Sequence, residues 1–306
     1  MSDTSEPRRP RRITPLAQPS FAAGPARFPL AESAIVTLVQ WALDEDHAFN
    51  DVTSIATVLS TRRARAQLVA REPGVIAGVP LALAAFHLVD RSVEIRVDAE
   101  DGASVARGGT VLFLSGHARG LLAAERTALN FLQRLSGIAS LTRRFVDAVR
   151  GTGTAIVDTR KTTPGWRRLE KYAVRCGGGI NHRADLASAV LIKDNHLASV
   201  DGDIVEAMRR VREHAPAGTP VQVECETAAQ VRTAVEAGAE SVLLDNMTLD
   251  ALRESVAIAK GRCITEASGG VRLDTVRAIA ETHVDRISVG ALTHSAPALN
   301  LALDFE

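Results

Sequence analysis

Residues 221–245, VQVECETAAQVRTAVEAGAESVLLD, decide the fold class of this chain. The stretch contains an apolar run, VQVEC, then a segment of helical character, and then a second apolar run, SVLLD. A nearly continuous apolar strand is typical of a parallel sheet, because other elements bury both of its faces. The stretch therefore predicts one strand–helix–strand unit of a parallel sheet.

The same alternation extends in both directions, from Thr154 to Gly290. Roughly six or seven such units in about 140 residues predict a (β/α) barrel, complete or incomplete, and a doubly wound open sheet is the alternative. Neither GxxxxGK[ST] nor GxGxxG follows a strand, so the common nucleotide-binding folds lose support. The predicted strands are TAIVDT, AVLIKD, VQVECE, SVLLDN, RCITEA and RISVG, and the helical stretches include VDGDIVEAMRRVREH, TAAQVRTAVEAG and TLDALRESVAIAK.

Before this alternation, residues 29–146 have a mixed pattern that predicts an α+β domain. LAESAIVTLVQWALDED predicts an amphipathic helix, and ARAQLVARE, VEIRV and TVLFLSG predict short strands. A long helix is expected from Leu121 to about Val146. This helix has an apolar stripe and a second, polar stripe that we expect to lie against a partner surface or a site. The stripes are Ala128, Leu132, Leu135 and Ala139, and Arg126, Asn130, Gln133 and Gly137.

The composition argues against several classes of protein. The 36 Lys and Arg residues balance the 36 Asp and Glu residues, so the basic excess of a general nucleic-acid binder is missing. Three cysteines without a CxxC pair predict neither a disulfide framework nor a structural zinc site, and they indicate a reducing compartment. No apolar run approaches the ~18–20 residues of a membrane span. We therefore expect a soluble cytoplasmic protein with no nucleic-acid or membrane partner.

The first 28 residues are rich in Pro, Ser, Ala and Arg and show no apolar periodicity, which predicts a disordered tail. Within it, the basic residues Arg8, Arg9, Arg11 and Arg12 could contact an anionic partner or act as a targeting signal, and a merely solvated tail is the alternative. The predicted organisation is thus a tail, an α+β domain and a barrel.

Polar or glycine-rich residues follow the predicted barrel strands one after another. Active-site groups of a barrel lie at the carboxyl ends of its strands, so this succession predicts an active site. The side chains of Glu224 and Glu226 alternate onto one face of their strand, and both would converge with Lys193 and Asp245 if that face looks into the barrel. The strand ends are Asp158-Thr159-Arg160-Lys161, Lys193-Asp194-Asn195-His196, Glu224-Cys225-Glu226, Asp245-Asn246, Ser268-Gly269-Gly270 and Gly290-Ala291.

Three sub-sites follow from these residue types. The turns at Ser268-Gly269-Gly270 and Val289-Gly290-Ala291 are each expected to run directly into a helix, so their N–H groups and the helix dipole could cradle a phosphate, with ordinary turns as the alternative. Glu224 and Asp245 suit Mg²⁺ or sugar hydroxyls, with a salt bridge to Lys193 as the alternative. The third sub-site is cationic and indicates a ligand with several negative charges. Its residues are Arg160, Lys161, His182, Arg183 and Lys193, joined by Arg126 if that residue reaches the same site.

At these residues the sequence closely resembles the quinolinate phosphoribosyltransferase family, also called nicotinate-nucleotide pyrophosphorylase (carboxylating). The resemblance covers nearly everything from about residue 30 onward and is most specific in the central block. It implies an α/β sandwich domain of residues 29–146 that is joined by the C-terminal segment 292–306, and an incomplete (β/α) barrel of residues 147–291. The matching stretches are ERTALNFLQRLSGIA, DTRKTTPGWRRLEKYAVRCGGGINHRADLASAVLIKDNH, VECE, LLDN, EASGG and SVGALTHSAPALNLALD.

The resemblance also implies the reaction: quinolinate and phosphoribosyl pyrophosphate give nicotinate mononucleotide, pyrophosphate and CO₂. It further implies Mg²⁺ near Glu224 and Asp245, and a homodimer, or a higher assembly of dimers, in which Arg126 acts across the interface. The implied catalytic residues are Lys161, Lys193, Glu224 and Asp245. The implied substrate-binding residues are Arg126, Thr159, Arg160, Lys161, His182, Arg183, Lys193, Glu224, Asp245, Ser268, Gly269, Gly270, Val289, Gly290, Ala291 and His294.

Two departures from the family pattern are small. Asn50 stands where a Gly before Asp-Val-Thr is usual, and Trp166 replaces a more common aliphatic residue. Three rival functions remain open at this stage. They are a phosphoribosyltransferase for another anionic ring such as nicotinate, a lyase that forms a Schiff base at Lys193, and a sensor that binds a phosphometabolite without turnover.

Overall fold

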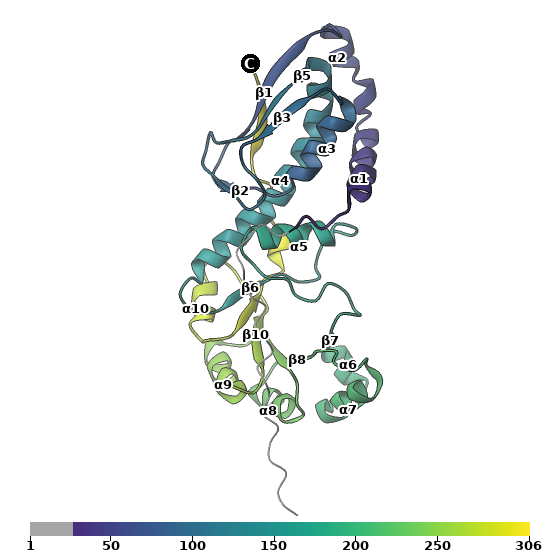
Figure 1. Cartoon of the computed structure of the whole chain (residues 1–306). Coiled ribbons are helices and arrows are strands. Elements are labelled where there is room, and N and C mark those ends of the chain that lie inside the picture. Colours follow the sequence, from purple (N-terminus) through teal and green to yellow (C-terminus); the bar gives the residue numbers. More distant parts are fainter. Residues whose placement is uncertain (1–26) are drawn as a thin grey trace, which may run out of the picture.

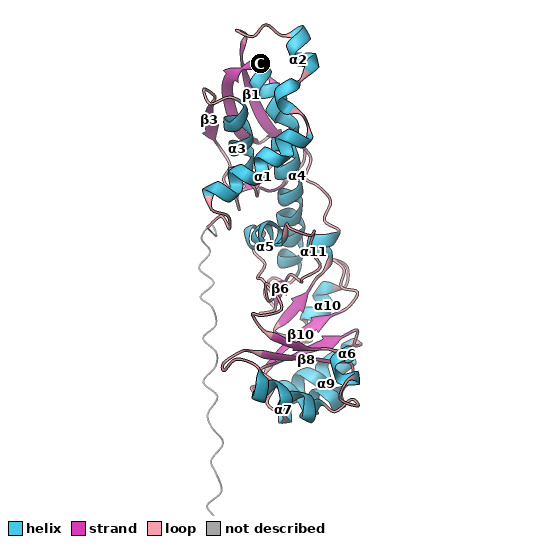
Figure 2. Ribbon diagram, turned by 90° about the vertical axis from the view of Figure 1, so that its right-hand side faces the viewer, coloured by secondary structure: helices cyan, strands magenta, loops and turns pink. Residues whose placement is uncertain are grey.

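The computed structural model describes residues 27–306, which form two large sheets connected by one long helix, and a small two-stranded sheet, β2-β4 (Figure 1). Most of the predicted tail, with its arginine cluster, lies outside the described residues. Phe28, the last residue of that predicted tail, packs edge-on against Tyr172 with ring centroids 5.1 Å apart. Figure 2 shows the two sheets at opposite ends of the molecule, with the long helix running between them.

The N-terminal part contains a four-stranded antiparallel sheet in the order β12-β1-β5-β3. The predicted amphipathic helix and the three predicted strands are confirmed as α1, β1, β3 and β5. The C-terminal strand β12 pairs along β1, so the end of the chain returns to this sheet. The elements are α1 (Glu32–Glu45), η1 (Ala48–Asn50), α2 (Val52–Thr57), β1 (Arg63–Ala70), β2 (Gly74–Val75), α3 (Val79–Val89), β3 (Glu94–Val97), β4 (Ser104–Val105), β5 (Thr110–His117), α4 (Ala118–Ala148) and β12 (Leu301–Phe305).

The long helix α4 holds the C-terminal segment by part of its predicted polar stripe. The apolar stripe is fully buried, as expected. The Gln133 side chain donates to the Leu301 carbonyl, and a Cβ on Gly137 would come within 2.0 Å of the Pro297 carbonyl oxygen. The surface that this end of the stripe contacts therefore belongs to the same chain. Arg126, at the other end of the stripe, is exposed.

The C-terminal part contains a six-stranded parallel sheet in the order β6-β11-β10-β9-β8-β7. The first strand lies beside the last, as in a barrel, whereas the order of a doubly wound sheet reverses at a switch point. Because β6 and β7 do not pair with each other in the described chain, the barrel is incomplete, as predicted. Its strands are β6 (Ala155–Val157), β7 (Val190–Ile192), β8 (Val221–Cys225), β9 (Ser241–Asp245), β10 (Ile264–Ser268) and β11 (Arg286–Ser288).

Helices follow these strands and cover the sheet, because their apolar faces pack on its buried residues (Figure 1). All six predicted strands and the three predicted helical stretches of this part are present. Within the described residues, no helix has both the length and the apolar character needed to cross a membrane. The helices are α5 (Arg167–Cys176), α6 (Asp194–Ala198), α7 (Ile204–His214), α8 (Ala228–Glu236), α9 (Leu249–Ala259), α10 (Val276–Ala280) and α11 (Ala291–His294).

Candidate active site

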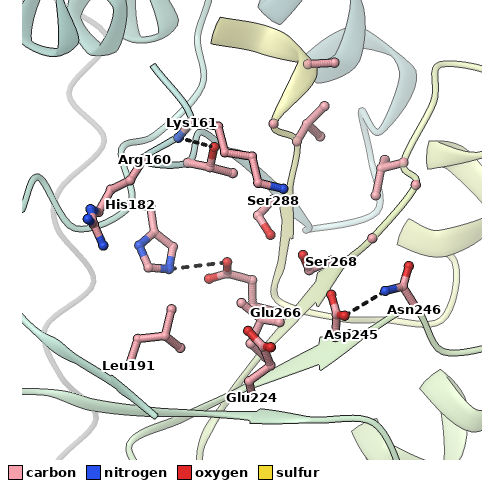
Figure 3. A pocket seen from close by; sticks show the side chains of 18 of the residues that line it. Arg160, Lys161, His182, Leu191, Glu224, Asp245, Asn246, Glu266, Ser268 and Ser288 are labelled. Carbon is pink, nitrogen blue, oxygen red and sulfur yellow. Dashed lines mark hydrogen bonds and ion pairs between the residues drawn. The ribbon is translucent and has the colours of Figure 1, made fainter. Parts of the chain in front are cut away.

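A cavity of about 790 Å³ opens at the carboxyl ends of the six parallel strands. It brings together every substrate-binding residue expected from the sequence except Arg126, which is exposed on α4 and does not line it. Figure 3 shows side chains from several strand ends pointing into this space. Asn246, which the sequence placed at a strand end, also lines the cavity. The lining residues that the sequence did not single out are Leu191, Leu243, Glu266, Val271, Arg272 and Ser288.

The glycine-rich turns form one side of the cavity. Gly269 has a φ of +98°, and a Cβ there would lie 2.1 Å from the Asn246 side-chain oxygen, so only glycine fits. The expectation that both turns lead directly into helices is wrong for the first one, because α10 begins only at Val276. The second turn does lead directly into α11, a helix of four residues. Free backbone amides, more than helix dipoles, are what these turns offer to an anion.

Two carboxylates lie at neighbouring strand ends. Glu224 accepts a hydrogen bond from Lys193 Nζ at 2.7 Å, so the ion pair that we considered as an alternative is present. Asp245 accepts a hydrogen bond from the side-chain amide of Asn246 at 2.7 Å. These oxygens suit Mg²⁺ only with further donors, because the described residues hold no cluster of three or more His, Cys, Asp or Glu side chains able to bind a metal.

The prediction that Glu226 converges with Glu224 is wrong. Strand β8 ends at Cys225, and the backbone N–H of Glu226 donates to the Gln230 side chain. Thr227 and Gln230 cap α8 reciprocally, which turns the chain away from the sheet at this point. Glu226 is consequently exposed and does not line the cavity.

The opposite side of the cavity carries the cations. Burial and the neighbouring Arg160 guanidinium both lower the pKa of Arg183. Lys161 is the next residue in the chain after Arg160, and Figure 3 shows its side chain reaching toward Ser288. Several cations placed this close repel one another, and a bound anion would relieve that repulsion. Five side-chain cations line the same cavity as His182: Arg160, Lys161, Arg183, Arg272 and Lys193, the last of which is paired with Glu224.

A buried ion pair supports the loop that carries His182. Asp158 is fully buried and accepts a hydrogen bond from Lys171 Nζ, which is 5% exposed. Burial raises the pKa of Asp158 and lowers that of Lys171, and the attraction between the two opposes both changes. Asp158 also accepts from the His182 backbone N–H at 2.8 Å, and Lys171 donates to the His182 carbonyl at 3.1 Å. The sequence placed Asp158 among the strand-end groups, but it does not line the cavity.

Helix α5 supplies further anchoring that the sequence did not indicate. Glu170, also fully buried, accepts from Arg134 at 2.7 Å and from the Thr163 hydroxyl at 2.8 Å. Tyr172, two residues further along α5, donates its hydroxyl hydrogen to Asp101 of the N-terminal part at 2.7 Å. The unusual Trp166 stacks on Phe131 of α4. Helix α5 therefore ties the loop after β6 to the rest of the molecule.

The chain matches two family models that between them cover most of its length. Residues 51–136 match "Quinolinate phosphoribosyl transferase, N-terminal domain", and residues 138–304 match the C-terminal domain of the same name. The chain belongs to the quinolinate phosphoribosyltransferase family. The resemblance seen in the sequence is thereby confirmed.

Relatives and solved structures of this family agree over nearly the whole chain. The nicotinate-nucleotide pyrophosphorylase [carboxylating] of Mycobacterium leprae is 44% identical over 87% of this chain and 95% of its own length. The probable enzyme of the same name from Bacillus subtilis is 41% identical over 85% of this chain and 89% of its own. The structure of the nicotinate-nucleotide pyrophosphorylase from Francisella tularensis superposes with a TM-score of 0.85. It is 35% identical and covers 92% of this chain and all of that one. The sandwich-plus-barrel architecture is thus the family's own.

Proposed function

We propose that the cavity transfers the phosphoribosyl group of phosphoribosyl pyrophosphate to quinolinate, giving nicotinate mononucleotide, pyrophosphate and CO₂. This places the chain in the de novo synthesis of NAD, as a decarboxylating pentosyltransferase. The observation that carries the proposal is the union, in one cavity, of a cationic wall with amide-lined turns and two carboxylates. Each of these three features meets one part of the two substrates.

The cationic wall suits the pyridine dicarboxylate. Guanidinium groups pair with carboxylates through two parallel hydrogen bonds, and lysines add point charges. We assign Arg160, Lys161, Arg183 and Lys193 to the two carboxylates of quinolinate. A ring held in this way would present its nitrogen to the second substrate in a fixed orientation.

The other side of the cavity suits phosphoribosyl pyrophosphate. Its 5′-phosphate would bind the turn amides, and its ribose hydroxyls would face Glu224 and Asp245. The binding set on this side is Ser268, Gly269, Gly270, Val289, Gly290, Ala291 and His294, with Thr159 at the boundary between the two sub-sites.

The chemistry follows from these charges. The pyridine nitrogen displaces pyrophosphate at the anomeric carbon, and positive charge develops on the ribose as the bond breaks. Glu224 and Asp245 stabilise that charge. Lys161 and Lys193, which also attract the quinolinate carboxylates, stabilise the negative charge on the leaving group. Glu224 and Asp245 would hold Mg²⁺ together with oxygens of the substrate, and the ion would supply positive charge that offsets part of the same negative charge. The ribosylated ring nitrogen is cationic and accepts the electron pair left when the adjacent carboxylate departs as CO₂.

The Schiff-base alternative loses support from the ion pair between Lys193 and Glu224. A lysine nucleophile must be free to attack a carbonyl, whereas Lys193 Nζ donates to the Glu224 carboxylate at 2.7 Å. A nicotinate transferase and a non-catalytic sensor are separated from the proposal by the assay described below.

The proposal includes a homodimer in which Arg126 completes the partner subunit's cavity. Its support is that Arg126 is exposed and outside the cavity of its own chain. We further propose a cytoplasmic location, which the three free thiols favour, and a division of the chain into residues 29–146 with 292–306, and 147–291. Mixing R126A with K161A protein should restore part of the activity that each lacks alone. Absence of recovery despite proven subunit exchange would contradict the shared site.

The first assay measures pyrophosphate release with Mg²⁺ and phosphoribosyl pyrophosphate, with quinolinate and nicotinate compared in parallel. We expect turnover with quinolinate only, and CO₂ release equal to pyrophosphate release. Turnover with nicotinate alone would identify a different ring substrate. Binding of quinolinate in calorimetry without any turnover would favour the sensor.

A further inference from the structure

Both ring nitrogens of His182 have partners within the described chain. The backbone N–H of Arg183 donates to Nδ1 at 2.8 Å, so Nδ1 is an acceptor and carries no proton. The other ring nitrogen, Nε2, lies 3.0 Å from the Gln222 side-chain oxygen and 3.5 Å from Glu266 Oε1. Both of these atoms are acceptors, so Nε2 carries the ring's proton.

The orientation of the Gln222 amide is fixed by Glu266. Gln222 Nε2 donates to Glu266 Oε2 at 3.2 Å, and the reverse orientation would place two acceptor oxygens against each other. With its nitrogen turned to the carboxylate, the amide can offer only its oxygen to His182. A chain of directed hydrogen bonds therefore runs from the Arg183 backbone through His182 and Gln222 to Glu266.

Glu266 is a fully buried carboxylate with one oxygen that lacks a hydrogen-bond donor. It lies at the floor of the cavity, and the oxygen without a donor among the described residues is Oε1. Figure 3 shows this carboxylate beside the His182 ring, joined to it by a dashed line. Burial of a carboxylate oxygen without a donor is costly, so its persistence calls for a reason. Asp158 and Lys171 already hold the His182 backbone, so the contribution of Glu266 and Gln222 is to orient its ring.

We propose that Glu266 and Gln222 are positioning residues that keep the ring proton of His182 on Nε2, while the backbone N–H of Arg183 keeps Nδ1 unprotonated. This inference rests on the proposed function for its purpose. A quinolinate nitrogen must be unprotonated to attack the ribose, and a neighbouring imidazolium could protonate it. A neutral ring whose single N–H points at the floor binds beside the substrate without offering it a proton. His182 is then a shaped wall of the quinolinate sub-site and not one of its cations.

The direct test is ¹⁵N NMR of the histidine side chains in the free wild-type protein near pH 8, with the H182Q variant to assign the signals. We expect one protonated nitrogen, Nε2, and one unprotonated nitrogen, Nδ1. A proton on Nδ1, or on both nitrogens, would overturn the proposal. This spectrum needs no turnover, so it stands apart from the assay of the reaction itself.

The second test is the variant E266Q, which keeps the shape of the side chain and removes its charge. Gln222 is then free to turn over, so we expect a mixed ¹⁵N signal at His182. We also expect a KM for quinolinate raised roughly tenfold, with the KM for phosphoribosyl pyrophosphate nearly unchanged. An unchanged spectrum or an unchanged KM for quinolinate would overturn the role of Glu266.

Two further variants keep this test decisive. Thr265 lies on the same strand and bonds Asp285, so T265V perturbs β10 away from the cavity and should leave both spectrum and KM unchanged. If E266Q does not fold, Q222M removes the acceptor of Nε2–H by a different route and should raise the same KM. A Q222M protein with wild-type KM and a wild-type spectrum would exclude the arrangement.

Discussion

The cavity is built from two layers that differ in what their polar groups face. The upper layer, Arg160, Lys161, Lys193, Glu224 and Gly269, faces the space that substrates would enter. The lower layer, Asp158, Lys171, Gln222 and Glu266, is buried, with Glu266 at the cavity floor, and its members bond one another in pairs. Upper-layer groups are positioned by where strands end, whereas lower-layer groups are positioned by each other. Substitutions should therefore affect substrate binding in the first layer, and both folding and function in the second.

The largest effect is expected where the lower layer loses one member of its ion pair. D158A leaves the Lys171 ammonium buried without its carboxylate, which should lower the free energy of unfolding by about 3–5 kcal/mol. Urea unfolding measures this loss. The double variant D158L/K171M removes both charges and should recover most of the stability without recovering activity, because the His182 backbone has then lost both of its partners. Equal instability of the single and double variants would show that the pair matters through shape and not through charge.

The same division explains what the sequence could predict. The strand ends of the upper layer were readable because apolar runs mark where each strand stops and barrel topology gathers those ends. Asp158 and Lys171 are 13 positions apart and meet only once α5 packs against the sheet. Glu266 was hidden inside a run that reads as a buried strand, although its position two residues before Ser268 places both side chains on one face. The error at Glu226 arose from a helix cap that ends β8 one residue early.

A second prediction concerns the turn at Gly269 in the upper layer. G269A must place a Cβ against the Asn246 side chain and adopt a positive φ, so the turn should open. We expect the KM for phosphoribosyl pyrophosphate to rise by more than ~10-fold, while quinolinate binding in calorimetry changes little. G261A is a matched control, because Gly261 also has a positive φ but no atom near its missing Cβ, and it lies outside the cavity. Equal effects of the two variants would mean that backbone strain alone is responsible.

A third prediction separates charge in the cavity from charge elsewhere. K161A and R183A should each weaken quinolinate binding at least ~10-fold, because each removes a cation from the dicarboxylate sub-site. Isothermal titration with quinolinate measures the change. R253A removes an equal charge from the exposed pair with Asp250 on α9 and should have no effect. Unchanged affinity in K161A and R183A would contradict the assignment of the quinolinate sub-site.

The smallest effect is expected at Cys225, which adjoins the upper-layer residue Glu224 but is fully buried. Burial raises the pKa of the Cys225 thiol to about 12. Since an unfolded thiol titrates near pH ~8.5, the neutral thiol of the folded protein contributes stability below that pH, and the contribution is lost as the pH rises toward 12. The urea midpoint of unfolding should therefore fall further between pH 7 and pH 10 in the wild type than in C225A. An equal fall in both proteins would place the alkaline loss of stability in other groups. The buried thiol of Cys225 would then make no contribution to the pH dependence of the protein's stability.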